Sequence, residues 1–128
     1  EGNAENIWKK RRAMDVKRTL LSVFGVGSGI ANMSLVLIEG LYHLTFSDRD
    51  YANMDIKPDV HTMRVLYRLG VSPAINETEA IIAARQLSPA YPGAIDGPLW
   101  SIGRKWCHPT NPECESCPLN ACCERVGL

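Results

Sequence analysis

Apolar residues recur at helical spacing in the first third of the chain. Residues 15–22 form a short amphipathic pattern, which is typical of a helix, with apolar positions at Val16, Leu20, Leu21 and Val23. The turn Phe24-Gly25-Val26-Gly27 ends it, and Ser28 is expected to cap a second helix. In this second segment apolar residues occur on all sides of the helix and not along one face, which predicts a buried helix. Its apolar residues are Ile30, Ala31, Met33, Leu35, Val36, Leu37, Leu41 and Tyr42.

The pattern breaks from Thr45 to Lys57, where polar residues predict an irregular segment with a loop at residues 47–50. Order resumes at Pro58-Asp59, because proline is tolerated in the first turn of a helix and aspartate is a preferred cap. The helix that begins near Asp59 is expected to end at Gly70. Its predicted inward positions are Val60, Met63, Val65, Leu66 and Leu69.

Two more helical segments follow. Asn76-Glu77-Thr78-Glu79 is typical of a capped helix start and precedes a predicted helix at residues 80–87. A stretch rich in proline and glycine separates it from an apolar segment at residues 94–106. No run alternates apolar and polar residues long enough for a strand, so an all-α fold is predicted.

The length of 128 residues and 45% hydrophobic content allow one compact core. The longest apolar run, Met33 to Ile38, falls short of the roughly 20 residues that span a bilayer, so no membrane partner is expected. The first residues lack an initiator methionine and a signal pattern, which is compatible with a chain that begins inside a longer parent.

The basic and acidic side chains number 14 each, so the net charge of zero identifies no partner. Basic residues nevertheless gather near the start, at Lys9, Lys10, Arg11, Arg12, Lys17 and Arg18. Taken alone, this run is slightly more typical of a solvent-exposed helix face than of a nucleic-acid contact.

All five cysteines lie between Cys107 and Cys123, which favours a metal site over disulfides because their number is odd. Gaps of six, two and five residues allow four thiolates to converge, at Cys107, Cys114, Cys117 and Cys123. Spacing does not distinguish iron from zinc, and it does not decide between Cys122 and Cys123.

The stretch Gly103-Arg104-Lys105-Trp106-Cys107, with these gaps, resembles the carboxy-terminal cluster of endonuclease III and its relatives, the helix-hairpin-helix DNA glycosylases. The resemblance implies a [4Fe-4S] cluster, with zinc as the alternative. It also implies a basic DNA-facing loop, which Arg104, Lys105 and His108 would have to supply because residues 108–113 contain no lysine or arginine.

Residues 21–32 are similar to the family's helix-hairpin-helix, whose hairpin amides grip the DNA backbone without reading sequence. The DNA-binding residues implied there are Gly25, Val26, Gly27, Ser28 and Gly29. Without the resemblance, the same glycines predict only a tight turn. The chain is accordingly divided into a basic segment at 1–14, a helical domain at 15–103 and a cluster loop at 104–128.

Asp59 occupies the position of the family's catalytic aspartate, in a segment that reads Pro58-Asp59-Val60-His61-Thr62. It also suits a structural helix cap, and the two roles can coexist. An anion below the sugar would help an oxocarbenium-like transition state, and Asp59 could also orient or deprotonate the attacking water. His61 is expected to be a packing or DNA-facing residue.

Bifunctional relatives carry a Schiff-base lysine where this chain has Gly29. The resemblance therefore implies a monofunctional DNA glycosylase that hydrolyses the N-glycosidic bond of a damaged or mismatched base, with Lys57 as the only nearby substitute amine. The distance from the hairpin to Asp59 is longer than usual, and the surplus falls in residues 45–57, where it would displace the aspartate or add a substrate loop.

The resemblance covers residues 15–123 and corresponds to the second half of a family member. The implied partners are double-stranded DNA with a lesion or mismatch and an amino-terminal segment of the parent chain, in the cytoplasm with the nucleoid or in the nucleus. The alternatives are a non-catalytic iron–sulfur DNA-binding module and an electron carrier or redox sensor.

Overall fold

The computed structural model describes residues 2–9 and 11–128. No strand occurs in these two ranges, so the prediction of an all-α fold is confirmed. Of the basic run near the start, Lys10 lies outside the described residues. The α-helices are α1 (Ala13–Leu21), α2 (Ser28–Gly40), α3 (Val60–Arg68), α4 (Glu77–Leu87) and α5 (Asp96–Lys105). Short 3-10 turns occur at Ala4–Ile7, Tyr51–Asn53, Pro92–Ile95, Cys114–Ser116 and Asn120–Cys122.

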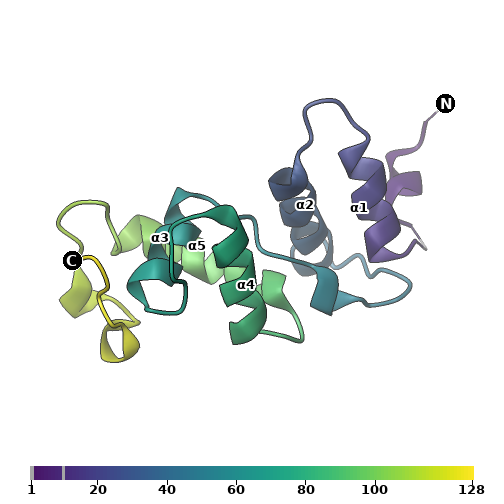
Figure 1. Cartoon of the computed structure of the whole chain (residues 1–128). Helices are drawn as coiled ribbons and strands as arrows, with labels where there is room; N and C mark the ends of the chain where they lie inside the picture. The colour runs from purple at the N-terminus through teal and green to yellow at the C-terminus, as the bar shows by residue number, and fades with distance from the viewer. Residues whose placement is uncertain (1, 10) are drawn as a thin grey trace.

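The helices form two groups, each around its own core (Figure 1). The first group holds α1 and α2, and its buried residues are Ala13, Val16, Leu35, Phe46 and Met54. The second group holds α3, α4 and α5, and its buried residues are Ile56, Val65, Leu66, Ala80, Ala83, Ala84 and Leu99. The chain starts beside the first group, and its cysteine-bearing end lies at the far side of the second.

The caps of α3 and α4 are where the sequence predicts them. The Asp59 side chain accepts hydrogen bonds from two amides of the first turn of α3, and the Asn76 side chain accepts one from the Glu79 amide. Asp and Asn satisfy the otherwise unpaired amides of a first helical turn, which explains why both helices begin there. Helix α4 begins at Glu77, three residues before the predicted Ala80, because its cap is Asn76.

Three predictions about burial and capping are wrong. Ser28 is the first residue of α2 and Gly27 is its N-cap, with no side-chain hydrogen bond. Helix α2 is not buried all round, because its residues Ile30 and Leu37 are exposed, as is Leu41 directly after it. Val60 is exposed as well, since it stands at the first position of α3 and points away from the core.

Residues 45–57, which we call the connector, form a packed part of the molecule. Phe46, Met54 and Ile56 are buried, the first two in the first core and Ile56 in the second. The buried carboxylate of Asp55 accepts two hydrogen bonds from the Arg85 guanidinium of α4, at 2.7 and 2.9 Å. The connector therefore joins the two groups of helices.

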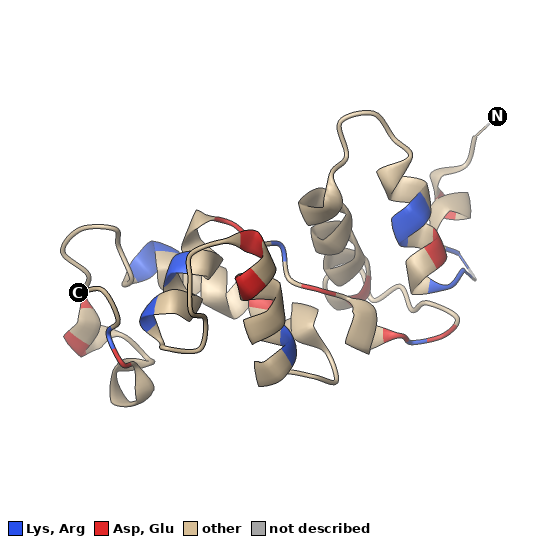
Figure 2. Cartoon of the chain, viewed as in Figure 1, with Lys and Arg blue, Asp and Glu red and all other residues tan. Residues whose placement is uncertain are grey.

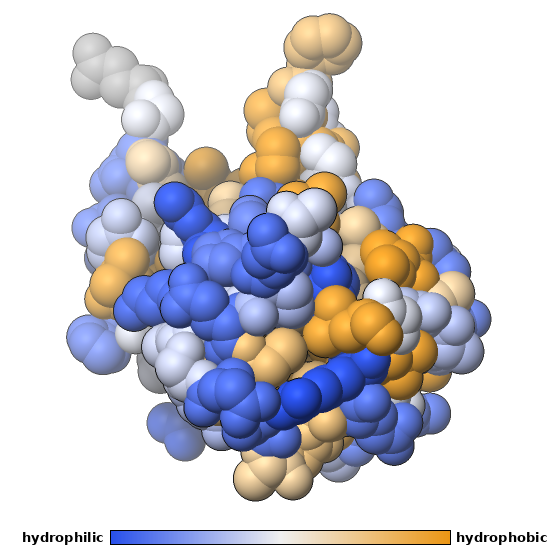
Figure 3. All heavy atoms as spheres, turned by 90° about the vertical axis from the view of Figure 1, so that its left-hand side faces the viewer, coloured by the Kyte–Doolittle hydropathy of each residue, from blue (hydrophilic) through white to orange (hydrophobic). Residues whose placement is uncertain are grey.

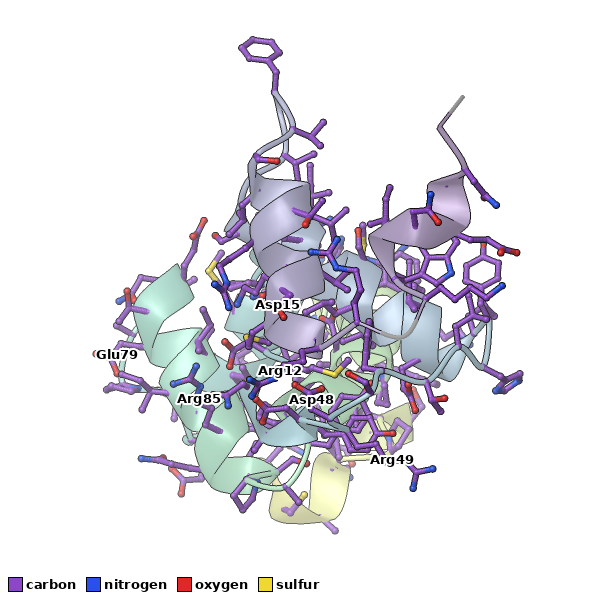
Figure 4. The ribbon with its side chains drawn as sticks, turned by 90° about the vertical axis from the view of Figure 1, so that its right-hand side faces the viewer. Arg12, Asp15, Asp48, Arg49, Glu79 and Arg85 are labelled. Carbon is purple, nitrogen blue, oxygen red and sulfur yellow. The ribbon has the colours of Figure 1, made fainter. Side chains whose placement is uncertain are left out.

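The connector also closes the end of α1. Asp48 accepts a hydrogen bond from the Ala13 amide at 3.2 Å and pairs with Arg12 at 3.2 Å (Figure 4). Acidic residues of the connector lie on the ribbon below α1, whose own ribbon carries basic residues (Figure 2). This arrangement satisfies an amide at the start of α1 that would otherwise lack a partner. None of the helices in the described part of the chain is long and apolar enough to cross a membrane.

Candidate active site and cysteine centre

Asp59 is held rigidly by the start of α3. Its Oδ1 accepts hydrogen bonds from the amides of His61 at 2.8 Å and Thr62 at 2.9 Å, and the Thr62 hydroxyl accepts one from the Asp59 amide at 2.9 Å. This reciprocal capping box leaves Oδ2 with no hydrogen-bond partner among the described residues. One oxygen thus fixes the carboxylate, and the other remains available to a ligand.

Asp59 lines an open cavity of about 880 Å³, counting its mouth, which we call the Asp59 cavity. Helix α2 supplies an apolar wall, and the connector, the N-cap of α3 and the start of α5 supply the charged side chains. The lining residues are Met33, Val36, Leu37, Lys57, Asp59, Asp96, Gly97 and Trp100. An open pocket that combines an apolar wall with carboxylates is typical of a ligand-binding site.

Asp96 is a second carboxylate in this cavity, which reasoning from the sequence missed. Burial, together with the nearby charge of Asp59, raises the pKa of Asp96, and the backbone amide and charge of Lys57 partly oppose this rise. Asp96 stands at the first position of α5. Aspartate is common in the first turn of a helix, because its charge interacts favourably with the helix dipole. Its presence there in the sequence therefore did not indicate that it lines a cavity.

Lys57 lies across the start of α2. A Cβ atom built on Gly29 would stand 3.5 Å from Cγ of Lys57, which is ordinary van der Waals contact. The stem of Lys57 therefore packs over Gly29, the position at which the family resemblance places a lysine in bifunctional relatives. Gly29 and Lys57, which are far apart in the sequence, therefore lie against each other, and Lys57 lines the Asp59 cavity.

The hairpin between α1 and α2 projects from the molecule (Figure 3). Gly25 adopts φ +84°, a backbone conformation that residues other than glycine rarely adopt. The first amide of α2 with a partner is that of Ala31, which donates to Gly27 at 3.0 Å. The preceding amides of Ser28, Gly29 and Ile30 have no hydrogen-bond partner among the described residues, and three such amides at a helix start suit a phosphate.

Arg104 and Lys105 are exposed at the last turn of α5 and stack on aromatic rings. The Arg104 guanidinium lies 4.8 Å from the ring centre of Trp100, and Lys105 Nζ lies 5.7 Å from that of Trp106. Because Trp100 lines the Asp59 cavity, Arg104 places positive charge near its edge. His61 packs edge-on against the same Trp100 ring, with 6.4 Å between ring centres.

Four of the five cysteines line one cavity, which we call the cysteine cavity. It measures about 320 Å³ with its opening, and its sulfur-bearing residues are Cys107, Cys114, Cys117 and Cys123. Cys122 is exposed and lies outside this lining. None of the five forms a disulfide. The geometry therefore favours Cys123 over Cys122 as the fourth member, a choice that the spacing left open.

The donor set of the cysteine cavity fits a metal centre. Its lining combines the four cysteines with the apolar side chains of Trp106, Pro112 and Leu128. In residues 2–9 and 11–128, no three histidine, cysteine or acidic side chains stand close enough together to hold a single metal ion. Thiolates bind both zinc and iron–sulfur clusters, so the four cysteines suit either group.

Two arginines fasten the cysteine segment to α3. The Arg68 guanidinium donates to the carbonyls of His108 at 2.6 Å and Pro109 at 3.0 Å, and it lies 3.4 Å from Cys107 Sγ. Arg64 donates to the Cys107 carbonyl at 2.7 Å. Both side chains are buried, and their spacing of four residues on one helix face was the signal that the sequence analysis did not use.

Comparison with known proteins gives one informative similarity. No protein-family model matches the chain. The chain is 32% identical over 114 residues to a protein named Endonuclease III from Thermotoga maritima. The similarity supports the helix-hairpin-helix DNA glycosylase family. It covers 88% of this chain and 48% of the relative, so the chain spans about half the length of the protein it matches.

Proposed function

We propose that this chain is the part of a DNA glycosylase that carries the hairpin, the catalytic aspartate and an iron–sulfur cluster. The observation that supports this most is the position of Asp59, which is fixed through one carboxylate oxygen and lines the Asp59 cavity. The similarity to an endonuclease III along most of the chain supports the same function. The reaction is hydrolysis of the bond between a damaged or mismatched base and its sugar.

Binding begins at the DNA backbone. A phosphate accepts hydrogen bonds from the amides of Ser28, Gly29 and Ile30 at the start of α2, where the helix dipole also favours negative charge. Arg104 and Lys105 contribute positive charge at the end of α5. These contacts position the duplex without reading its sequence, so binding is expected to weaken as salt increases.

The chemical step takes place at the Asp59 cavity. When a nucleotide is turned out of the duplex, its sugar enters beside the carboxylate. Positive charge develops on the sugar as the base departs, and the negative charge of Asp59 stabilises it. The same carboxylate orients a water molecule for attack and accepts its proton, a contribution typically worth about 10²–10⁴ in rate.

The cluster has a mainly structural role in this proposal. The ligands would be the thiolates of Cys107, Cys114, Cys117 and Cys123, which line the cysteine cavity. When bound, a [4Fe-4S] cluster supplies four strong iron–sulfur bonds that hold the end of the chain together. Zinc is the alternative metal, and iron and acid-labile sulfide analysis of the purified protein separates the two.

The rest of the active-site cleft belongs to the parent protein in this proposal. Leu37 of α2 and Leu41 directly after it are exposed, and an amino-terminal segment of the parent chain would cover them and read the expelled base. The substrate is accordingly double-stranded DNA with a lesion or mismatch, and the base that is removed is chosen by residues outside this chain.

The decisive experiment compares base release by the natural protein that contains this chain with release by its Asp59→Asn variant. Asparagine still caps α3, so the loss of charge is isolated from the loss of the cap. Base release from a panel of lesion-containing duplexes is expected to fall by about a hundredfold or more. Asp15→Asn, at an exposed pair with Arg18, is the matched control and is expected to leave the rate unchanged.

A second function, a non-catalytic DNA-binding module, is favoured by Gly29, which replaces the amine of bifunctional relatives. It predicts salt-sensitive DNA binding with no base release from any duplex in the panel. Equal rates for the parent and Asp59→Asn would exclude Asp59 as the catalytic group, and binding without release would replace the glycosylase proposal by the binding module.

A further inference from the structure

The backbone of Lys57 is fixed on both sides. The buried side chain of Asn32 donates to the Ile56 carbonyl at 3.2 Å, which anchors the residue before Lys57 to α2. Pro58 follows and restricts Lys57 to extended conformations. Next comes Asp59, locked by the capping box of α3. The position of Lys57 is therefore set by the fold.

The side chain of Lys57 leads from this fixed point into the Asp59 cavity. Its stem packs over Gly29, where the missing side chain leaves room for it, and the residue lines the cavity beside Asp59 and Asp96. The chain contains five lysines, and among the described residues no other lysine lines this cavity. No ion pair within 4.0 Å occupies Lys57 among the described residues.

We propose that Lys57 is an amine nucleophile that captures the abasic sugar, the product of base release, as a covalent Schiff base. The amine comes from the connector instead of the residue after the hairpin glycine. The proposal rests on the glycosylase function, since it uses the same cavity, but it concerns a separate activity on a separate substrate, the ring-opened aldehyde of abasic DNA.

The reaction is an ordinary condensation of an amine with an aldehyde. Lys57 Nζ adds to C1′ of the open sugar, and a bond forms between nitrogen and carbon. Nζ gives up two protons, the aldehyde oxygen leaves as water, and a carbon–nitrogen double bond remains. No oxidant or reductant takes part. The neighbouring carboxylates of Asp59 and Asp96 accept and return the protons, and the burial that raises the pKa of Asp96 suits that group to the exchange.

A purely electrostatic role for Lys57 is the competing explanation. An ammonium group in this place would attract a DNA phosphate next to the uncapped start of α2. An arginine would fill that role equally well, because it keeps the charge, but it would form no Schiff base. The two explanations therefore differ in the effect of Lys57→Arg.

The test is reductive trapping on a duplex that contains one abasic site. Borohydride reduces the Schiff base to a stable amine, so protein and DNA migrate together on a denaturing gel. The natural protein that contains this chain is expected to give the adduct, and peptide mass spectrometry is expected to place it on Lys57. Lys57→Met, which keeps the stem over Gly29, and Lys57→Arg are both expected to reduce trapping to background. Lys9→Met, at an exposed pair with Glu5, should leave trapping unchanged.

Three outcomes would overturn the inference: no adduct with the parent protein, an adduct mapped to another amine, or undiminished trapping in Lys57→Met. Circular dichroism of each variant confirms that its helices are retained. The glycosylase proposal is judged separately, because base release is measured on a different duplex with Asp59→Asn. If the parent protein releases bases but gives no adduct, the assignment of Lys57 fails while the glycosylase proposal stands.

Discussion

At the residue scale, Asp59 both caps α3 and lines the Asp59 cavity. Because asparagine keeps the capping oxygen and removes the charge, capping and charge can be separated by substitution. Asp59→Ala is expected to lower the free energy of unfolding by about 1 kcal/mol, because two amides lose their acceptor, whereas Asp59→Asn should cost only a few tenths. Urea denaturation of both variants checks this. Equal stability of the two would mean that the cap contributes nothing.

Single residues were predictable from the sequence where one local rule decides. Asp59 and Asn76 cap their helices because short polar side chains satisfy first-turn amides regardless of the rest of the fold. Asp96 and the arginines Arg64 and Arg68 were missed because their roles depend on which distant segment lies opposite them. Arg64, for example, binds a carbonyl 43 residues away.

At the element scale, the connector decides how α1 begins. Burial opposes the charge of the Asp48 carboxyl, but hydrogen bonds from the Ala13 amide and the Arg12 guanidinium outweigh it and lower its pKa. A group with a lowered pKa stabilises the fold above its unfolded pKa, and this contribution disappears as the pH falls through the folded value.

Asp48→Asn is accordingly expected to lower the free energy of unfolding by about 0.5 kcal/mol at neutral pH. The difference in unfolding free energy between Asp48→Asn and the parent should shrink as the pH falls below the pKa of the unfolded carboxyl and through the lower pKa of the folded one. Denaturation curves across this acidic range measure it. Asp50→Asn is the control on the same segment, because its carboxylate binds only the Asn53 side chain. A difference that stays constant with pH would contradict the assigned cause.

The elements themselves were predictable to different degrees. Helices α3 and α4 were predicted because their apolar spacing and caps agree. The buried state predicted for α2 was wrong, since a helix that is apolar all round does not reveal whether its partner surface belongs to the same chain. The packing of the connector escaped prediction because Phe46, Met54 and Ile56 are scattered among polar residues and follow no helical or strand period.

At the scale of the whole molecule, the end of the chain has no core of its own. No residue from Cys107 to Leu128 is buried, whereas each helical group surrounds a set of buried apolar side chains. This end is held to α3 by Arg64 and Arg68 and by a hydrogen bond from the Val126 amide to the Arg68 carbonyl at 3.1 Å. Its conformation should therefore depend strongly on whatever the four cysteines bind.

Removing the metal from the loaded protein is thus expected to act locally. Without thiolate bonds, residues 107–128 lose the interactions that replace a core, while α1, α2 and the connector keep Phe46 and Met54 buried. Hydrogen exchange after oxidation and chelation should show faster exchange in residues 107–128 and at the end of α3, with protection in α1 and α2 retained. Cys122→Ser, outside the cysteine cavity, should bind metal and exchange like the parent, whereas Cys123→Ser should exchange like the metal-free protein. Uniform loss of protection would show instead that both helical groups depend on the metal.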